Sequence, residues 1–155
     1  MPFVIRKYQD ADLEPVTRLW RLAREVSLPD FQREKGYPFD KDQWYFNTHI
    51  LPENQLYVAE QYDRAVGFLA IKDDFVDCLY IHPDFWRMGI GKALLDFAKQ
   101  LSPQRVWLYT LQINVNARAF YENNGFKAVR FGVSLPPENE PDVMYEWTPQ
   151  ANTVK

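Results

Sequence analysis

Cysteine and histidine are scarce in this chain of 155 residues, which contains one Cys and two His. The lone cysteine, Cys78, can form neither an internal disulfide nor a paired-cysteine metal motif. His49 and His82 lie far apart in the sequence, so we expect no metal site. No stretch approaches the roughly 20 apolar residues of a membrane span, and the N-terminus lacks the pattern of a signal peptide. We therefore predict a protein of the reducing cytoplasm that has no membrane partner.

Positive charge is also in short supply, because 18 Lys and Arg face 21 Asp and Glu, a net charge of −3. A protein that binds nucleic acid by neutralising phosphates usually carries a basic surplus, so we expect no nucleic-acid partner. The length fits a single domain over residues 1–155, with no internal repeat or linker. Aromatic residues, in contrast, make up 16% of the chain. Because each ring buries a large area, some can be spared to line a pocket.

Hydrophobic periodicity predicts both helices and strands. The expected helices cover residues 11–26, 40–50, 89–101 and 114–124. Pro29, Gly36 and Pro38 indicate a loop over 27–39, and Pro52 is expected to end the second helix. The expected strands cover residues 2–8, 55–60, 65–71, 75–82, 105–111, 126–135 and 143–147. The strands within 55–82 should form an antiparallel meander, and the strand–helix alternation that follows implies an α+β domain with a mixed sheet.

The most informative stretch joins the strand that ends at His82 to the helix that begins near Gly89. A glycine-bearing turn at a helix start directs unpaired N–H groups and the positive end of the helix dipole at one point, which suits a phosphate or pyrophosphate. Gly89 and Gly91 would let a ligand approach the backbone. A Walker A loop fits worse, because Lys92 is followed by Ala93. A Rossmann turn would need a third glycine. Taken alone, this motif is equally compatible with a tight structural turn.

Two motifs together resemble the GNAT superfamily of acetyl-CoA-dependent N-acetyltransferases. The family's (Arg/Gln)-x-x-Gly-x-(Gly/Ala) loop corresponds to residues 86–91, with Trp86 at its head and Arg87 one position later. The family's Asn-x-x-Ala-x-x-Phe-Tyr-Glu-x-x-Gly-Phe pattern corresponds to residues 114–126. The order of elements also matches over nearly the whole chain. The resemblance implies the GNAT fold, a twisted, mixed but mostly antiparallel sheet of about seven strands flanked by about four helices.

The resemblance further implies acetyl-CoA as co-substrate, with no metal. Backbone groups of the loop would hold the pyrophosphate, while backbone groups at Leu79 and Ile81 would pair with the pantetheine arm as an added strand does. Asn114 would contact the pantetheine or serve as a plain helix N-cap. Whether Trp86 packs on the helix or touches the cofactor, and whether Arg87 reaches a phosphate, stays open. The implied cofactor residues are Leu79, Tyr80, Ile81, Trp86, Arg87, Met88, Gly89, Ile90, Gly91, Lys92 and Asn114.

Two residues are the first candidates for proton transfer. Tyr121 matches the family's usual general acid, which protonates the departing CoA thiolate. The other interpretation is a core ring beside Phe120 and Phe126. Asp77 is the candidate base, because it lies two residues before Leu79 and alternation would place both on one face of a strand. An ion pair or a hydrogen bond to a neighbouring strand would explain Asp77 equally well.

Weaker candidates for the base are Glu60, His82 and an ordered water chain. His82 also fits a turn residue before Pro83, and Glu60 fits a solvated hairpin position. Cys78 alternates to the face opposite Asp77, so we expect a buried thiol and no acyl-cysteine intermediate.

The acceptor side is less defined. In the resembled fold it is framed by the first helix pair and the loop between the last strands, which here offer Trp20, Trp44, Tyr45, His49 and the acidic segment 138–142. Rings and carboxylates suit a small cationic amine. We therefore expect transfer of an acetyl group from acetyl-CoA to a primary amine of a small molecule within a ternary complex. The alternatives are a protein or peptide N-acetyltransferase and a non-catalytic acyl-CoA sensor. A homodimer is compatible with the resemblance.

Overall fold

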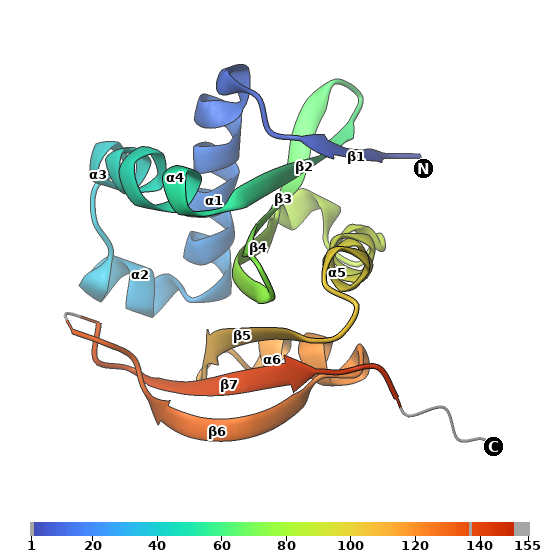
Figure 1. Ribbon diagram of the computed structural model, residues 1–155. Helices are drawn as coiled ribbons and strands as arrows, with labels where there is room; N and C mark the ends of the chain where they lie inside the picture. Colours follow the sequence, from blue (N-terminus) through green and yellow to red (C-terminus); the bar gives the residue numbers. More distant parts are fainter. Residues whose placement is uncertain (1, 137, 151–155) are drawn as a thin grey trace.

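The computed structural model describes residues 2–136 and 138–150 of the chain (Figure 1). Its strands form a seven-stranded sheet in the order β1-β2-β3-β4-β5-β7-β6. The pairing is antiparallel throughout except between β4 and β5, which are parallel. The strands are β1 (Val4–Lys7), β2 (Gln55–Gln61), β3 (Arg64–Lys72), β4 (Phe75–Ile81), β5 (Val106–Leu111), β6 (Lys127–Val133) and β7 (Pro141–Trp147).

Helices cover both faces of this sheet (Figure 1). One face carries the N-terminal helices and the other carries α5 and α6, so the described part of the chain is a three-layer α+β fold. The helices are α1 (Leu13–Ser27), α2 (Pro29–Lys35), α3 (Phe39–Tyr45), α4 (Leu51–Glu53), α5 (Ile90–Leu101) and α6 (Val115–Asn123). Short turns η1 (Asp10–Asp12) and η3 (Pro83–Phe85) are 3₁₀-helical, and η2 (Phe46–Ile50) is π-helical.

Each face of the sheet has its own hydrophobic core. Under α5 and α6, side chains such as Leu94, Leu108 and Tyr145 are fully buried. On the opposite face, Val16 of α1 and Phe46 of η2 pack on β2 and β3. These two cores fix the positions of the two helical layers relative to the sheet.

The predicted fold class and the antiparallel meander are confirmed, but two local predictions are wrong. Residues 29–35 form helix α2, where a loop was expected. Pro29 occupies the first turn, where its fixed φ favours a helix and its missing N–H costs nothing. Pro52 does not end the helix before it but lies inside α4. The preceding π-helical turn already departs from the α pattern, since the N–H of Leu51 donates to the carbonyl of Phe46, five residues back.

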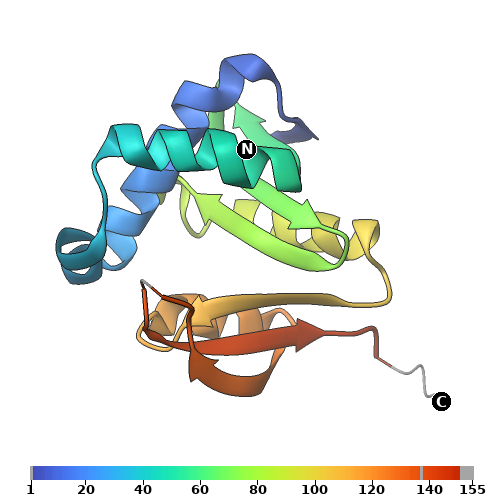
Figure 2. The same cartoon turned by 60° about the vertical axis from the view of Figure 1, so that its left-hand side comes forward.

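Strands β4 and β5 are joined at one end only. Their pairing is limited to Phe75 opposite Trp107, with a further hydrogen bond of 3.0 Å from the Trp107 N–H to the Asp74 carbonyl. Beyond that point the two strands diverge, and Figure 2 shows the space between them widening along their length. The sheet therefore has two inner strand edges whose backbone groups lack strand partners.

Candidate active site

The edge of β4 that faces this gap offers backbone groups for an extended ligand. The N–H of His82 donates to the carbonyl of Val66 on β3, at 2.8 Å. Because successive residues of a strand direct their backbone groups to opposite sides, those of Tyr80 point to β3 and those of Leu79 and Ile81 point to the gap. This is the pair of residues for which strand-like pairing with a ligand was predicted.

Trp86 lies at the open end of this edge, and its indole Nε1 donates to the Ile81 carbonyl at 2.8 Å. The indole is 38% exposed. The indole is thus hydrogen-bonded to the end of β4, and a contact between Trp86 and the cofactor stays a prediction. This bond satisfies the Ile81 carbonyl and leaves the N–H groups of the edge for a ligand.

The turn between η3 and α5 adopts the left-handed conformation that glycine favours. Gly89 is the N-cap of α5 with φ of 85°, and a Cβ added there would meet no atom within 4 Å. Arg87 also has a positive φ, 64°, which is unusual for a long side chain. Met88 is exposed, whereas the Ile90 side chain belongs to the core, so Ile90 can contribute only its backbone. The open space over Gly89 and the free N–H groups of the first turn of α5 fit an anionic group.

Gly91 packs against α6, and Asn114 is the residue at which α6 begins. A Cβ at Gly91 would come within 3.3 Å of the Phe120 ring, so the glycine allows α5 and α6 to approach closely. The Asn114 side chain accepts a hydrogen bond from the Ala117 N–H at 3.1 Å, which is the N-cap geometry. Lys92 pairs with Asp96 at 2.8 Å on the exposed side of α5.

Tyr121 of α6 is buried among aromatic rings and lies near the diverging strands. Its ring centroid is 5.3 Å from that of Phe120, 5.7 Å from Phe126 and 6.0 Å from Tyr145. Burial raises the pKa of the Tyr121 phenol above its usual value, and the neighbouring Tyr80 and Cys78 of β4 raise this pKa further. The phenol is therefore protonated at neutral pH. The position among these rings agrees with the interpretation of Tyr121 as a core ring, and its role as general acid stays a prediction.

Asp77 does not share a face with Leu79, contrary to the prediction. Between β3 and β4 the register shifts, so that Ala70 pairs with Cys78 and Ile71 with Val76. Asp77 is thus the extra residue of a β-bulge, where alternation fails. As a result, Val76 faces the core under α5, and Cys78 faces the core under α1.

The exposed Asp77 carboxylate lies on the side of η2 and α4, where Asn54 Nδ2 donates to its Oδ2 at 3.0 Å. The same nitrogen donates to the Ile50 carbonyl at 2.9 Å, which fixes the amide. Asn54 could not be singled out from the sequence, because an Asn before a strand carries no distinctive signal. The partner is neither a cation nor a residue of a neighbouring strand, because Asn54 lies between α4 and β2, and the proton-transfer role of Asp77 stays a prediction.

A group of exposed rings includes Tyr45, which lies within electrostatic reach of Asp77. Tyr45, 48% exposed, has a raised pKa because of burial and then because of the negative charge of Asp77. The His49 ring stacks on Tyr45, with centroids 4.7 Å apart, and Trp44 packs edge-on against His49 at 5.5 Å. Three of the four rings expected on the acceptor side therefore form one exposed group. The fourth, Trp20, is only 7% exposed and belongs to the core.

The remaining candidates have structural partners. Glu60 accepts a hydrogen bond from Arg6 Nε at 2.5 Å on β1. His82 caps η3, with Nδ1 accepting from the Asp84 N–H at 3.1 Å, and burial lowers the pKa of its imidazole. Burial raises the pKa of the Cys78 thiol, which disfavours a nucleophilic thiolate.

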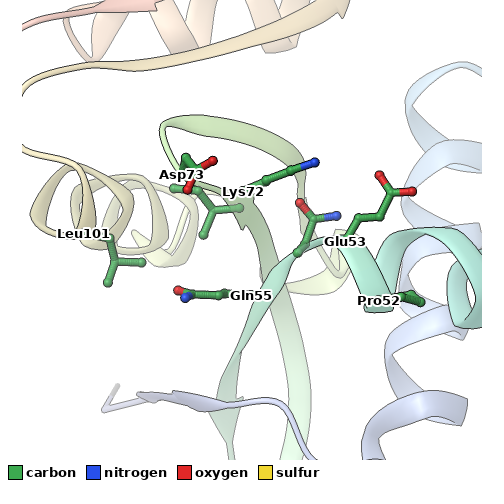
Figure 3. Close-up of a pocket in the computed structure, with 8 residues that line it drawn as sticks. Pro52, Glu53, Gln55, Lys72, Asp73 and Leu101 are labelled. Atoms are coloured by element: carbon green, nitrogen blue, oxygen red, sulfur yellow. The ribbon is translucent and has the colours of Figure 1, made fainter.

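A hollow of about 520 Å³ lies where β2 begins and β3 ends, between α4 and the end of α5 (Figure 3). Polar side chains including Glu53, Gln55 and Lys72 line it. It shares Asn54 with the Asp77 site and does not include the turn at Gly89. Within residues 2–136 and 138–150, no group of three or more His, Cys, Asp or Glu side chains could hold a metal ion. None of the helices in these residues is long and apolar enough to span a membrane.

Comparison with known proteins agrees with this geometry. The sequence profile of the "Acetyltransferase (GNAT) family" matches residues 16–126. A relative from Salmonella typhimurium named "Peptidyl-lysine N-acetyltransferase YjaB" is 32% identical over 124 residues, which cover 79% of this chain and 82% of the relative.

Solved structures share the fold. The solution structure of apo YjaB from Escherichia coli has a TM-score of 0.82 at 24% identity, covering 95% of this chain and 98% of that one. The PaiA N-acetyltransferase of Thermoplasma acidophilum, solved in complex with coenzyme A, has a TM-score of 0.69 at 21% identity, covering 96% and 99%. The profile match over more than two thirds of the sequence identifies the chain as an acyltransferase that belongs to the GNAT acetyltransferase family.

Proposed function

We propose that this chain transfers the acetyl group of acetyl-CoA directly to a primary amine bound in the same complex. The observation that carries the proposal is the gap between β4 and β5. The free edge of β4, the turn at Gly89 and the phenol of Tyr121 border it on one side of the sheet, and Asp77 lies at its closed end on the other side. A donor and an acceptor can therefore approach each other from the two faces.

In this proposal the backbone of residues 88–92 holds the pyrophosphate, and Leu79 and Ile81 pair with the pantetheine arm. Gly89 is essential because a side chain there would strain the turn and fill the space that the anion needs. Arg87 has no hydrogen bond or ion pair with any residue that the structure describes, so its guanidinium is available to a phosphate group.

The acceptor amine must lose a proton before it attacks the thioester carbonyl, since the pKa of a lysine ammonium is about 10.4. Asp77 accepts this proton directly or through water, with its carboxylate oriented by Asn54. As the C–S bond breaks, Tyr121 donates its phenolic proton to the CoA sulfur. The burial that disfavours the phenolate equally disfavours a thiolate, so the transfer is not opposed by the raised pKa of Tyr121.

From the sequence, a small-molecule amine was the expected acceptor, with a protein or peptide as the alternative. Two relatives named peptidyl-lysine N-acetyltransferase now favour a lysine side chain as the acceptor. The exposed rings of Trp44, Tyr45 and His49 also suit a polypeptide laid across the surface.

An acceptor panel tests the proposal. Peptides with a blocked N-terminus and one lysine, small alkylamines and free amino acids are incubated with acetyl-CoA, and free thiol and acetylated product are measured. We expect turnover with the lysine peptides above that with the small amines. If only the small amines are acetylated, the acceptor is a small-molecule amine, as expected from the sequence. Thiol release no faster than hydrolysis with every amine, despite acetyl-CoA binding, would refute catalysis and favour a sensor.

A further inference from the structure

Helix α2 and the turn between β6 and β7 face each other where β4 and β5 diverge (Figure 2). Lys35 is the last residue of α2. Its Nζ donates to the Glu140 carboxylate at 2.5 Å and to the Glu138 carbonyl at 2.9 Å. Among the residues described, these two hydrogen bonds are the ones that join α2 to the β6–β7 turn.

The turn presents its two acceptors in a fixed arrangement. The Glu140 N–H donates to Ser134 Oγ at 3.0 Å, and the Ser134 N–H donates to the Glu140 carbonyl at 2.9 Å. The Glu138 N–H is also held, by the Leu135 carbonyl at 3.2 Å. These bonds hold the backbone that carries the Glu138 carbonyl and the Glu140 side chain. A carbonyl beside a carboxylate suits an ammonium group, which has three donors and no acceptor.

We propose that the Glu138 carbonyl and the Glu140 carboxylate form an ammonium site for the acceptor, and that Lys35 occupies this site while no acceptor is bound. The inference rests on the proposed function and deepens it. The ligand is the cationic side chain of a basic residue that flanks the lysine to be acetylated in a polypeptide.

Exchange of one ammonium for another at this site is physically easy. The side chains of Lys35 and Glu140 are 39% and 23% exposed, and ion pairs of such exposure contribute little stability because water and salt screen them. The incoming ammonium forms the hydrogen bonds to Glu138 and Glu140 that Lys35 gives up, and the Lys35 ammonium is then hydrated by solvent. The net charge of −3 further favours a cationic partner.

Two substitutions test the roles of Lys35 and Glu140 separately. Lys35→Met removes the competing ammonium and keeps the apolar stem, whereas Glu140→Gln removes the charge of the receiving side chain at nearly constant shape. Arg33→Met is the matched control, since it removes a cation from the same helix, and among the described residues Arg33 forms an ion pair with the exposed Asp30 alone.

Binding is measured without catalysis. Backbone amide signals of Asn139 and Glu140 are followed by NMR during titration with Nα-acetyl-lysine methylamide, and with the norleucine analogue as the neutral probe. We expect Lys35→Met to bind the lysine probe about two- to fivefold more tightly than the unmodified chain, the range that one exposed ion pair supplies. Glu140→Gln should lose this binding, and Arg33→Met should leave it unchanged.

Equal affinities in all four proteins, or equal response to the neutral probe, would overturn the ammonium site. A parallel assay compares acetylation of lysine peptides with a flanking arginine or a flanking norleucine. If the peptides react alike in every variant, the ammonium site is wrong and the proposed function stands. If none reacts while the NMR result holds, the proposed function fails by itself.

Discussion

Replacing Gly89 with alanine tests the backbone basis of cofactor binding more directly than replacing any side chain. At φ of 85°, an L-residue other than glycine pays a conformational cost of about 1–2 kcal/mol. A Cβ at this position meets no atom within 4 Å, so steric clash inside the protein adds nothing to that cost. The cost to the protein itself therefore comes from the backbone conformation of the turn, and any overlap of the added Cβ with the bound anion would add to the loss of affinity.

The substituted turn relieves its strain by leaving the left-handed conformation, and CoA must then restore it. Because a binding-competent state that is fractionally populated lowers the apparent affinity by that fraction, 1–2 kcal/mol corresponds to roughly 5- to 30-fold weaker binding. Titration calorimetry with CoA measures this loss. Thermal unfolding should show at most a drop of about 2–8 °C, from about 2–4 °C per kcal/mol for a chain of this size.

Gly125 provides the matched control. It also has a left-handed φ, 90°, but it ends α6 on the side of Trp147, away from the turn at Gly89. Gly125→Ala should lower the melting temperature and leave CoA affinity intact. CoA affinity unchanged by Gly89→Ala would refute the reasoning. An equal loss of affinity in both variants would do so too, because the loss would then reflect general destabilisation.

Three further outcomes follow from the same geometry. Tyr121→Phe should lower kcat by about 10²- to 10⁴-fold and spare CoA affinity, as expected when a general acid is removed; unchanged turnover would leave Tyr121 as a core ring. Asn54→Ala should lower kcat, because the Asp77 carboxylate loses the donor that orients it. Asp77→Asn should flatten the acid limb of the pH–rate profile, and an intact limb would assign the base to a water relay. Finally, hydrogen bonds from Arg6 lower the pKa of Asp12 in the folded chain, so their stabilisation is complete above the unfolded pKa of 3.8 and is lost as the pH falls through the lower folded value. Urea unfolding at pH 6 and pH 3 should therefore show a smaller acid loss for Asp12→Asn than for the unmodified chain.

Local patterns were enough to predict much of the fold. The apolar period of residues 90–101 predicts α5, and the structure buries Leu94 and Ala98 as that period requires. Gly89 was recognisable because few residues other than glycine tolerate the conformation that begins this helix. Helix α5 and its glycine N-cap are both determined by residues close together in the sequence, so they can be predicted without knowledge of tertiary contacts.

Helix α2 could not be read in this way. Its sequence holds Pro29, and Gly36 and Pro38 follow, which is typical of a loop. The helix is stabilised by contacts elsewhere in the chain, such as packing on α1 and the two hydrogen bonds from Lys35 to a turn more than 100 residues away. Tertiary packing of this kind commonly overrides weak local preference in short helices.

A single β-bulge in β4 changes the face of the sheet on which Asp77 lies. Strict alternation assigned the Asp77 carboxylate to the face of the sheet that holds Leu79 and α5. The turn at Gly89, which begins α5, lies on that same face. The extra residue in β4 moves the carboxylate to the face that carries η2, where Asn54 and the exposed ring of Tyr45 lie. In the proposed mechanism, a base for the incoming amine is useful on the face that carries η2 and would be misplaced beside the turn at Gly89. The failed prediction therefore strengthens the proposed role of Asp77, because the bulge separates the group that would deprotonate the amine from the N–H groups that would hold the anionic donor.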